Sequence, residues 1–324
     1  MSQNTEPRKV AARRLGCYSL GVNDLLQKLL TLPTQTSPNE INEWWPWLLV
    51  QWRSCGSLFE KAALGGIYTD RLGFAFAGGY QAALRALFST LPDEQLAALC
   101  ATESMGAHPK AIQTKLSVSD EQRRLNGHKT FVTLADHAKV LFVVATTGER
   151  LVVVQINADA PGVQVTPMPP FSFVPEISHA EASFTEVALT EAQLLPGDGY
   201  DLYLKPFRTI EDIFVHTAFL GHLLGVARKY QWPHASMEDI LALLLSLEPL
   251  TKMNPSAPET HLALSGVIRN TKRLAKELDP LWESCPEEVR ARWQRDQRLL
   301  QVAEKVRQQR TESAWKKMLL LTKL

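Results

Sequence analysis

The chain has 324 residues, of which 45% are hydrophobic and 21% charged, and its 35 basic and 34 acidic residues leave a formal net charge of +1. This length and apolar content can bury a sizeable core, or about two to three packed units. The balanced charge argues against a strongly basic nucleic-acid-binding protein. Because no uninterrupted apolar run approaches the roughly 18 to 20 residues of a membrane span, and no signal-peptide pattern is found, we expect a cytoplasmic protein. The four cysteines lie far apart without histidines at ligand spacing, so we expect core thiols and no metal site.

The first part of the chain has a helical pattern. Four basic residues among the first twenty are typical of a solvated chain end or, alternatively, of a mitochondrial-type address. From residue 23 to about residue 98 the apolar residues recur at helical spacing, and the stretch 70–88 is rich in Leu, Phe and Ala. The glycine pairs at 65–66 and 78–79 indicate tight contacts or breaks. We predict an N-terminal helical domain over residues 1–98.

The period then changes to that of strands. Short segments rich in Val, Thr and Phe occur at 114–118, 128–134, 140–147, 151–157, 162–168 and 180–189. Asn126–Gly127 is typical of a two-residue type I′ hairpin turn, which needs positive φ at both central positions. Strands without intervening helices predict an antiparallel sandwich or barrel, and no G-x-G-x-x-G motif suggests a dinucleotide-binding βαβ unit. We therefore predict a middle β domain over residues 99–200.

The rest of the chain returns to a helical period. The segments 210–228, 237–250 and 258–278 are apolar or amphipathic. The last segment, 287–324, carries ten Lys or Arg against five Asp or Glu, a local charge of +5. A nucleic-acid-binding helix is one interpretation, but the apolar stripe of Val289, Trp293, Leu300 and Ala303 favours a packed helix with a solvated face. We predict a C-terminal helical bundle over residues 201–324, in an α+β chain that runs α, β, α.

Several ordered blocks resemble the acyl-CoA dehydrogenase family. They are a Thr-Glu turn at 101–106 (ATESMG), a hairpin-like block at 125–133 (LNGHKTFVT), a Phe-x-x-Val strand at 184–189 and the first C-terminal helix through Arg208 and 221–228. Together they cover roughly residues 70–230. The chain looks like a divergent, shortened member of this family, which implies an N-terminal helical domain, a middle β-sandwich or barrel and a C-terminal helical bundle.

The resemblance also implies chemistry. Family members bind FAD and oxidise an acyl-CoA between Cα and Cβ, with a glutamate that removes the α-proton while the flavin accepts a hydride. We therefore expect FAD as cofactor, acyl-CoA or another acyl thioester as substrate, a homodimer or homotetramer built through the C-terminal helices, and an electron-transfer partner. Neither nucleic acid nor a membrane is expected as a partner.

Site residues follow from the matching positions. Ala101 and Thr102 stand where the family turn faces the flavin edge, Phe131 where a tryptophan usually flanks the ring, and Thr133 where a ring-contacting Thr or Ser stands. A phenylalanine keeps the aromatic wall but lacks the indole donor, and core packing is an alternative role for it. Arg208 matches an arginine that orders the catalytic loop or contacts the acyl-CoA, and a solvent-facing arginine in the first turn of the helix is an equal alternative. Glu103 is expected to fix the turn.

The base is expected at Glu304. The sequence Arg295-Asp296 followed by Gln301 and Glu304 is in register with the family's Arg-Asp…Gln-x-Tyr-Glu-Gly-Thr. Here Lys305 replaces the glycine that breaks the helix and aims the carboxylate, so a helix that runs straight through would place Glu304 at the surface. Phe207 occupies the position where some relatives carry the base, and Glu211 and Asp212 follow one turn later.

Two departures concern the FAD diphosphate. Ala107–His108 replaces the family's Gly-Ser, and the Arg-x-x-Phe-Gly segment is missing because the corresponding stretch, 231–250, lacks arginine. Losing these donors weakens diphosphate binding. The sequence therefore leaves two alternatives beside the dehydrogenase: a flavin-free or non-catalytic scaffold, and another flavin-dependent oxidation on the same fold.

Overall fold

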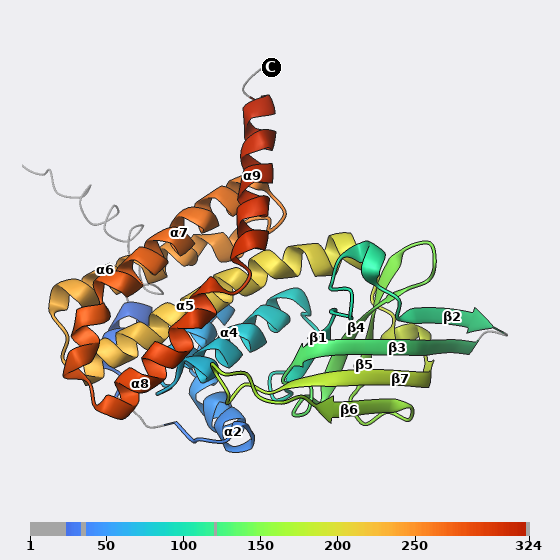
Figure 1. Ribbon diagram of the computed structural model, residues 1–324, viewed down its shortest axis with the longest axis horizontal. Coiled ribbons are helices and arrows are strands. Elements are labelled where there is room, and N and C mark those ends of the chain that lie inside the picture. The colour runs from blue at the N-terminus through green and yellow to red at the C-terminus, as the bar shows by residue number, and fades with distance from the viewer. Residues whose placement is uncertain (1–23, 34–36, 120–121, 322–324) are drawn as a thin grey trace, which may run out of the picture.

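Along the chain, helices precede and follow a β-sheet, and in space the two helical parts pack together beside it (Figure 1). The architecture is that of a computed structural model, which describes residues 24–33, 37–119 and 122–321. The basic stretch near the N-terminus and Cys17 lie outside these residues. Where described, Cys100 and Cys285 are buried and Cys55 is partly buried, and all three are free thiols.

The N-terminal helices pack through their glycines. A short helical segment at 24–31 precedes α2 (Ile41–Trp52), α3 (Leu58–Ile67) and α4 (Leu72–Leu87). A Cβ on Gly65 of α3 would lie 3.4 Å from the Cα of Gly78 in α4, and one on Gly66 would lie 1.8 Å from the carbonyl oxygen of Ala218 in the central helix α5 (Lys205–Lys229). The predicted tight contacts are thus confirmed, since only glycine lets these backbones approach so closely.

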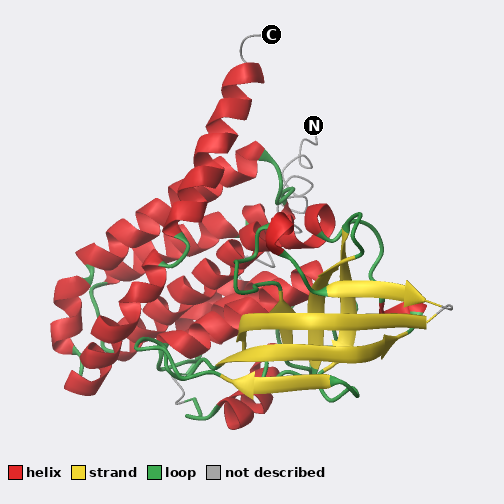
Figure 2. Cartoon of the chain, turned by 45° about the vertical axis from the view of Figure 1, so that its right-hand side comes forward, coloured by secondary structure: helices red, strands yellow, loops and turns green. Residues whose placement is uncertain are grey.

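The middle part is one seven-stranded sheet, which lies beside the helices (Figure 2). Its strands are β1 (Ala97–Cys100), β2 (Lys115–Ser119), β3 (Gln122–Thr133), β4 (Val140–Thr146), β5 (Leu151–Asn157), β6 (Val163–Pro167) and β7 (His179–Leu189). The order is β1-β4-β2-β3-β7-β6, with β5 paired to β4. Most pairings are antiparallel as predicted, but β1 and β2 pair with β4 in parallel, and β1 is a strand that the sequence pattern missed.

The hairpin turn predicted at Asn126–Gly127 is wrong. Both residues lie inside β3, whose pairing with β7 shifts register between Leu125 and Gly127, whereas β2 and β3 already pair from Ser119 and Gln122. The Asn126 amide exchanges hydrogen bonds with Glu186 of β7, at 2.6 Å to its carboxylate and 2.8 Å from its backbone N–H. A Cβ on Gly127 would lie 2.6 Å from the Cα of Thr114. The Asn-Gly pair therefore serves a bulge and a close backbone approach.

The C-terminal part comprises α5, α6 (His234–Leu247), α7 (Pro258–Glu277), α8 (Glu287–Asp296) and α9 (Glu304–Leu321). The expected single packed helix after residue 287 is wrong. A 3₁₀ turn at Gln297–Gln301 and a left-handed Ala303 at φ 61° separate α8 from α9, which projects away from the body (Figure 1). Val289 and Trp293 are buried as predicted, but Ala303 is exposed.

Helix α5 runs through the middle of the molecule and packs against α3 and α4. Among the described residues, the stretch Tyr200–Lys229 is the one that is long and apolar enough to cross a membrane, but 83% of its most apolar window is buried inside the protein. Such burial is typical of a core helix.

Candidate functional site

A cavity of about 240 Å³ opens where the three parts of the chain meet. We call it the junction cavity. Its walls are mostly aromatic and aliphatic. They come from α4, the end of β3, the loop between β6 and β7 with the first residue of β7, α5, the segment that links α8 to α9, and the start of α9. The lining residues are Phe76, Thr133, Phe171, Phe173, Val174, Ile177, His179, Glu211, Asp212, Val215, His216, Phe219, Leu299, Leu300, Val302, Ala303 and Arg307. Such an apolar site with a few polar groups is the usual form of a ligand site.

A buried ion pair joins the turn at 101–106 to β3 in the sheet domain. The Lys129 Nζ lies 2.7 Å from Glu103 Oε1, and the Glu103 carboxylate also accepts the backbone N–H groups of Gln113 and Thr114 at 2.7 and 3.0 Å. Burial would raise the pKa of Glu103, but Lys129 and the backbone donors outweigh it and lower that pKa. The expected structural role of Glu103 is confirmed, because its contacts tie the turn at 101–106 to β2 and β3.

The residues expected at the flavin edge lie close to one another. The carbonyl of Thr102 accepts the backbone N–H of Thr130 at 2.9 Å, which places the Thr-Glu turn beside Phe131. Phe131 has a left-handed backbone (φ 53°), is 49% exposed, and its ring centroid lies 6.2 Å from that of Phe171 in the cavity wall. Thr133 lines the cavity itself. Ala101 contributes differently, since its carbonyl accepts a long 3.5 Å bond from the buried Lys129.

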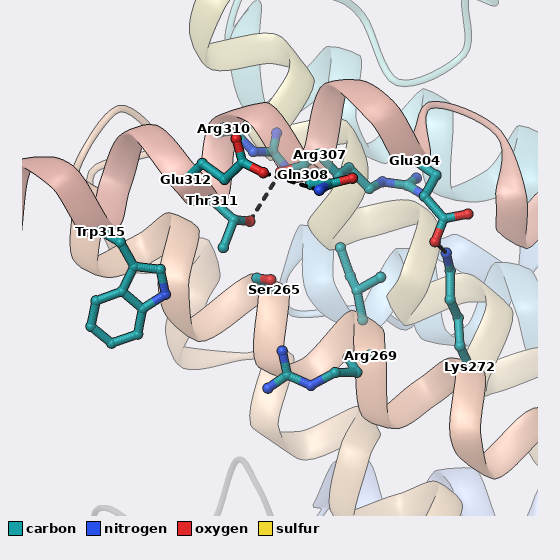
Figure 3. Close-up of a pocket in the computed structure, with 11 residues that line it drawn as sticks. Ser265, Arg269, Lys272, Glu304, Arg307, Gln308, Arg310, Thr311, Glu312 and Trp315 are labelled. Carbon is teal, nitrogen blue, oxygen red and sulfur yellow. Dashed lines mark hydrogen bonds and ion pairs between the residues drawn. The ribbon is translucent and has the colours of Figure 1, made fainter.

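Glu304 lies outside the junction cavity. Its carboxylate pairs with Lys272 of α7 at 2.9 Å, its side chain is 63% exposed, and it faces the groove between α7 and α9 (Figure 3). The hydrogen bond from Lys272 lowers the pKa of Glu304. The helix break that the family makes at glycine occurs here at Ala303, one residue before the glutamate. Ala303 therefore faces the cavity, whereas Glu304 begins α9 on the outer side.

Glu211 is the carboxyl group in the cavity wall that is free of an ion pair in the described chain. It lies on α5, one turn after Phe207, and is partly buried. Burial, with a smaller contribution from the charge of Asp212, raises the pKa of Glu211 to about 7. Glu211 therefore exchanges a proton near neutral pH, as a general base must.

The neighbouring Asp212 serves to hold α9. Its carboxylate binds Arg307 Nε at 2.8 Å and also Arg310, both from α9. These arginines outweigh burial and lower the pKa of Asp212. Asp212 therefore stays ionised and fixes the start of α9 against α5.

His216, one turn further along α5, is buried and neutral. Burial, followed by the charge of Arg307, lowers the pKa of His216 to about 4. Its Nδ1–H donates to the carbonyl of Asp212 at 2.7 Å, while Nε2 has no hydrogen-bond partner. A neutral imidazole adds no charge to the wall of the junction cavity.

Arg208 lies apart from the junction cavity. Its Nη2 donates a long 3.4 Å bond to the carbonyl of Ala107, just after the Thr-Glu turn, and it lines a separate basic cavity. The aromatic loop at 171–173 was not predicted from the sequence. Its only local signal is the Phe-Ser-Phe that directly follows Pro169–Pro170.

Comparison with known proteins agrees with this architecture. Residues 98–187 match the family model described as "Acyl-CoA dehydrogenase, middle domain". No curated protein matches the chain by sequence. The structure is similar to butyryl-CoA dehydrogenase from Megasphaera elsdenii, with 16% identity, a TM-score of 0.61, and 97% of this chain and 100% of that chain covered.

Two other similar structures are those of different enzymes. A glutaryl-CoA dehydrogenase from Mycobacterium smegmatis in complex with FADH2 is 14% identical, with a TM-score of 0.54 and coverage of 97% of this chain and 95% of that one. The prolyl acyl carrier protein oxidase AnaB is 15% identical, with a TM-score of 0.56 and coverage of 89% and 93%. The chain therefore has the acyl-CoA dehydrogenase fold. The family resemblance is confirmed by the middle domain, and the low identities show how far the chain has diverged.

Proposed function

We propose that this protein is an FAD-dependent oxidoreductase that oxidises an acyl thioester between Cα and Cβ in the junction cavity, with Glu211 as the base. One observation carries the proposal. Thr133, which stands where the family contacts the flavin, and Glu211, a carboxyl group with a pKa near neutrality, line the same apolar cavity from opposite parts of the chain. On this proposal, the two groups would form the two sides of a redox site.

The residues fit the ring of the cofactor better than its phosphates. Thr102 lies beside the last residues of β3, which include Phe131 and Thr133, and the half-exposed Phe131 offers an aromatic face. The cavity of about 240 Å³ is smaller than the roughly 300 to 1,000 Å³ usual for a complete ligand. It suits one ring system or one small acyl group, with the rest of each ligand extending along the surface. At the diphosphate end this chain offers His108 and Arg208 in place of the family's donors.

The chemistry then divides between cofactor and protein. FAD would supply the hydride acceptor. Glu211 would take the α-proton of the thioester in a dry, aromatic environment, where its raised pKa matches the working pH. Phe171 and Phe173 would exclude water from the acyl group. Arg307 and Arg310 both pair with Asp212 and not with Glu211, which leaves Glu211 as the proton acceptor.

Glu304, the base suggested by the family register, is the second candidate. Its ion pair with Lys272 would have to break before it could reach the cavity, and a lowered pKa makes it a weaker base than Glu211 at the same pH. We therefore place Glu211 first.

The partners follow from the same proposal. The acyl group would arrive as a coenzyme A or carrier-protein thioester, self-association would use the C-terminal helices, and electrons would leave to a flavoprotein or to oxygen. The oxidase relative AnaB makes oxidation of a carrier-bound acyl group the second candidate reaction on the same site. A flavin-free scaffold is the remaining alternative.

Anaerobic reduction of bound flavin tests the proposal. Full-length protein loaded with FAD should lose its visible flavin absorbance when mixed with a short-chain acyl-CoA. Glu211→Gln should keep the colour and slow the bleaching by about 10² to 10⁴-fold, because it removes a general base. Glu304→Gln is the matched control and should bleach at nearly the wild-type rate. The opposite ranking of the two variants would make Glu304 the base, and protein that binds no FAD would leave the scaffold alternative.

A further inference from the structure

A separate cavity of about 290 Å³ lies at the start of α5, between this helix, the start of α7 and one face of α9. We call it the basic cavity. Its lining is Tyr200, Lys205, Arg208, Ser256, Pro258, His261, Val306, Gln309, Arg310, Ser313, Ala314 and Lys317. These residues include four permanent cations and no carboxylate. Such one-sided charge in a concave site attracts anions.

Two of the four cations, Arg208 and Lys317, have no carboxylate partner among the described residues. Lys205 lies 3.3 Å from Asp201, and Arg310 binds Asp212, so both already have carboxylate partners. Arg208 has one long bond, to the Ala107 carbonyl at 3.4 Å, and within the described chain Lys317 has no ion pair. Arg208 and Lys317 therefore bring surplus positive charge to the same cavity.

The pKa of His261 also reflects the positive charge of the basic cavity. Its Nε2–H donates to the carbonyl of Pro255 at 2.9 Å, which leaves Nδ1 as an acceptor. Burial is the largest cause of its lowered pKa, and Arg310, Lys317 and Lys205 lower it further through their charges. The pKa of His261 should therefore change when the positive charge in the cavity changes.

The start of α7 adds backbone donors. This 20-residue helix begins at Pro258, and its N-cap Ala257 has no side chain that could accept the first-turn N–H groups. Free N–H groups and the positive end of the helix dipole favour an anion at that position. Ser256 and Ser313 offer hydroxyl groups at the rim.

We infer that the basic cavity binds a phosphate-bearing group, a diphosphate or a phosphomonoester, held between Lys317 of α9, Arg208 of α5 and the start of α7. Phosphate matches the site because a multiply charged oxyanion accepts bidentate bonds from arginine, a point contact from lysine and backbone N–H bonds. The group could belong to the nucleotide of a thioester's coenzyme A or to that of a dinucleotide cofactor. The site stands on its own geometry, whether or not the junction cavity oxidises a thioester.

Calorimetric titration of the full chain with inorganic pyrophosphate tests the inference. Lys317→Glu should weaken binding by about tenfold or more, since it removes a cation and adds an anion at the site. Lys316→Glu makes the same charge change one residue earlier, outside the lining, and should stay within about twofold of the wild type. Equal losses in both variants, or no binding of pyrophosphate to the wild type at millimolar concentration, would overturn the inference.

Two further experiments test where the anion binds and which kind of ligand carries it. In an NMR pH titration, pyrophosphate should raise the pKa of His261 in the wild type and in Lys316→Glu, and much less in Lys317→Glu; an unchanged His261 on saturation would place the anion elsewhere. Adenosine 3′,5′-bisphosphate that binds more tightly than ADP would assign the group to coenzyme A. The reverse order would assign it to the dinucleotide.

Discussion

The carboxylate of Asp296, at the end of α8, accepts the backbone N–H of Val174 at 2.7 Å, across the boundary between the C-terminal helices and the sheet domain. Asp296 is 1% exposed and is also bound by Arg295. Val174 has a left-handed backbone at φ 42°, unusual for a β-branched residue. The bond holds this strained loop, which carries Phe171 and Phe173 into the junction cavity.

Asp296→Ala should lower the free energy of unfolding by about 2 to 3 kcal/mol, because it leaves the buried Val174 N–H without an acceptor and removes the ion pair between Asp296 and Arg295. Urea unfolding measures the change. Glu288→Ala, at an exposed position on the same helix, should stay within about 0.5 kcal/mol of the wild type. Similar losses in both variants would mean that Asp296 does not organise the loop.

The ion pair of Glu103 and Lys129 predicts that substitutions of these two residues have non-additive effects on stability. Lys129→Met should cost about 3 to 5 kcal/mol, because the Glu103 carboxylate then stays buried without its cation. The double variant with Glu103→Gln should recover part of this loss, since both charges are gone. A double-mutant cycle in denaturant checks it, and additive losses would contradict a direct pair.

Ala303 predicts an unusual gain. Ala303→Gly should stabilise the fold by about 0.5 to 1 kcal/mol, because glycine adopts φ 61° without the steric cost that alanine bears. Ala291→Gly, the same change at an exposed site inside α8, should instead destabilise it by about 1 kcal/mol. If both variants lose stability equally in thermal unfolding, residue 303 is not left-handed in solution.

Glu211 predicts a pH dependence of stability. Its folded pKa of about 7 lies above that of an unfolded glutamate, about 4.3, so its contribution is fully present below about pH 4.3 and is lost as the pH rises through 7. Relative to the wild type, Glu211→Gln should therefore gain about 2 to 3 kcal/mol between pH 5 and pH 8. Unfolding free energies at the two pH values measure this gain.

Glu304→Gln is the control for the pH experiment. The pKa of the exposed Glu304 is lowered by Lys272, so this variant should gain no stability as the pH rises. A gain in Glu304→Gln, or none in Glu211→Gln, would contradict the assignment of Glu211 as the carboxyl group of the cavity wall.

Local patterns in the sequence were enough for much of the fold. Glycine pairs, strand alternation and helix periodicity depend on near neighbours, so the α-β-α order, most strands and the presence of tight contacts at the glycine pairs were predictable. Asn126–Gly127 failed because its bulge depends on Glu186 and Thr114, which are remote from it in sequence or on another strand. β1 was missed because a four-residue strand of Ala, Ala, Leu and Cys has little strand character.

The site was harder to predict for the same reason. Thr102, Phe131 and Thr133 follow a local motif, and the fold places them together. The orientation of Glu304 depends on where the chain breaks, and the break falls at Ala303, a residue that no local rule marks as left-handed. The raised pKa of Glu211 arises from burial among three parts of the chain, which only the assembled structure reveals.

The most direct test of the account is the visible spectrum of full-length protein after equilibration with FAD and removal of the free cofactor. We predict a bound flavin band that Phe131→Ala weakens, while Val118→Ala, an exposed apolar residue on β2, leaves it unchanged. Colourless wild-type protein, or equal retention of flavin by Phe131→Ala, would contradict a ring held at this end of β3.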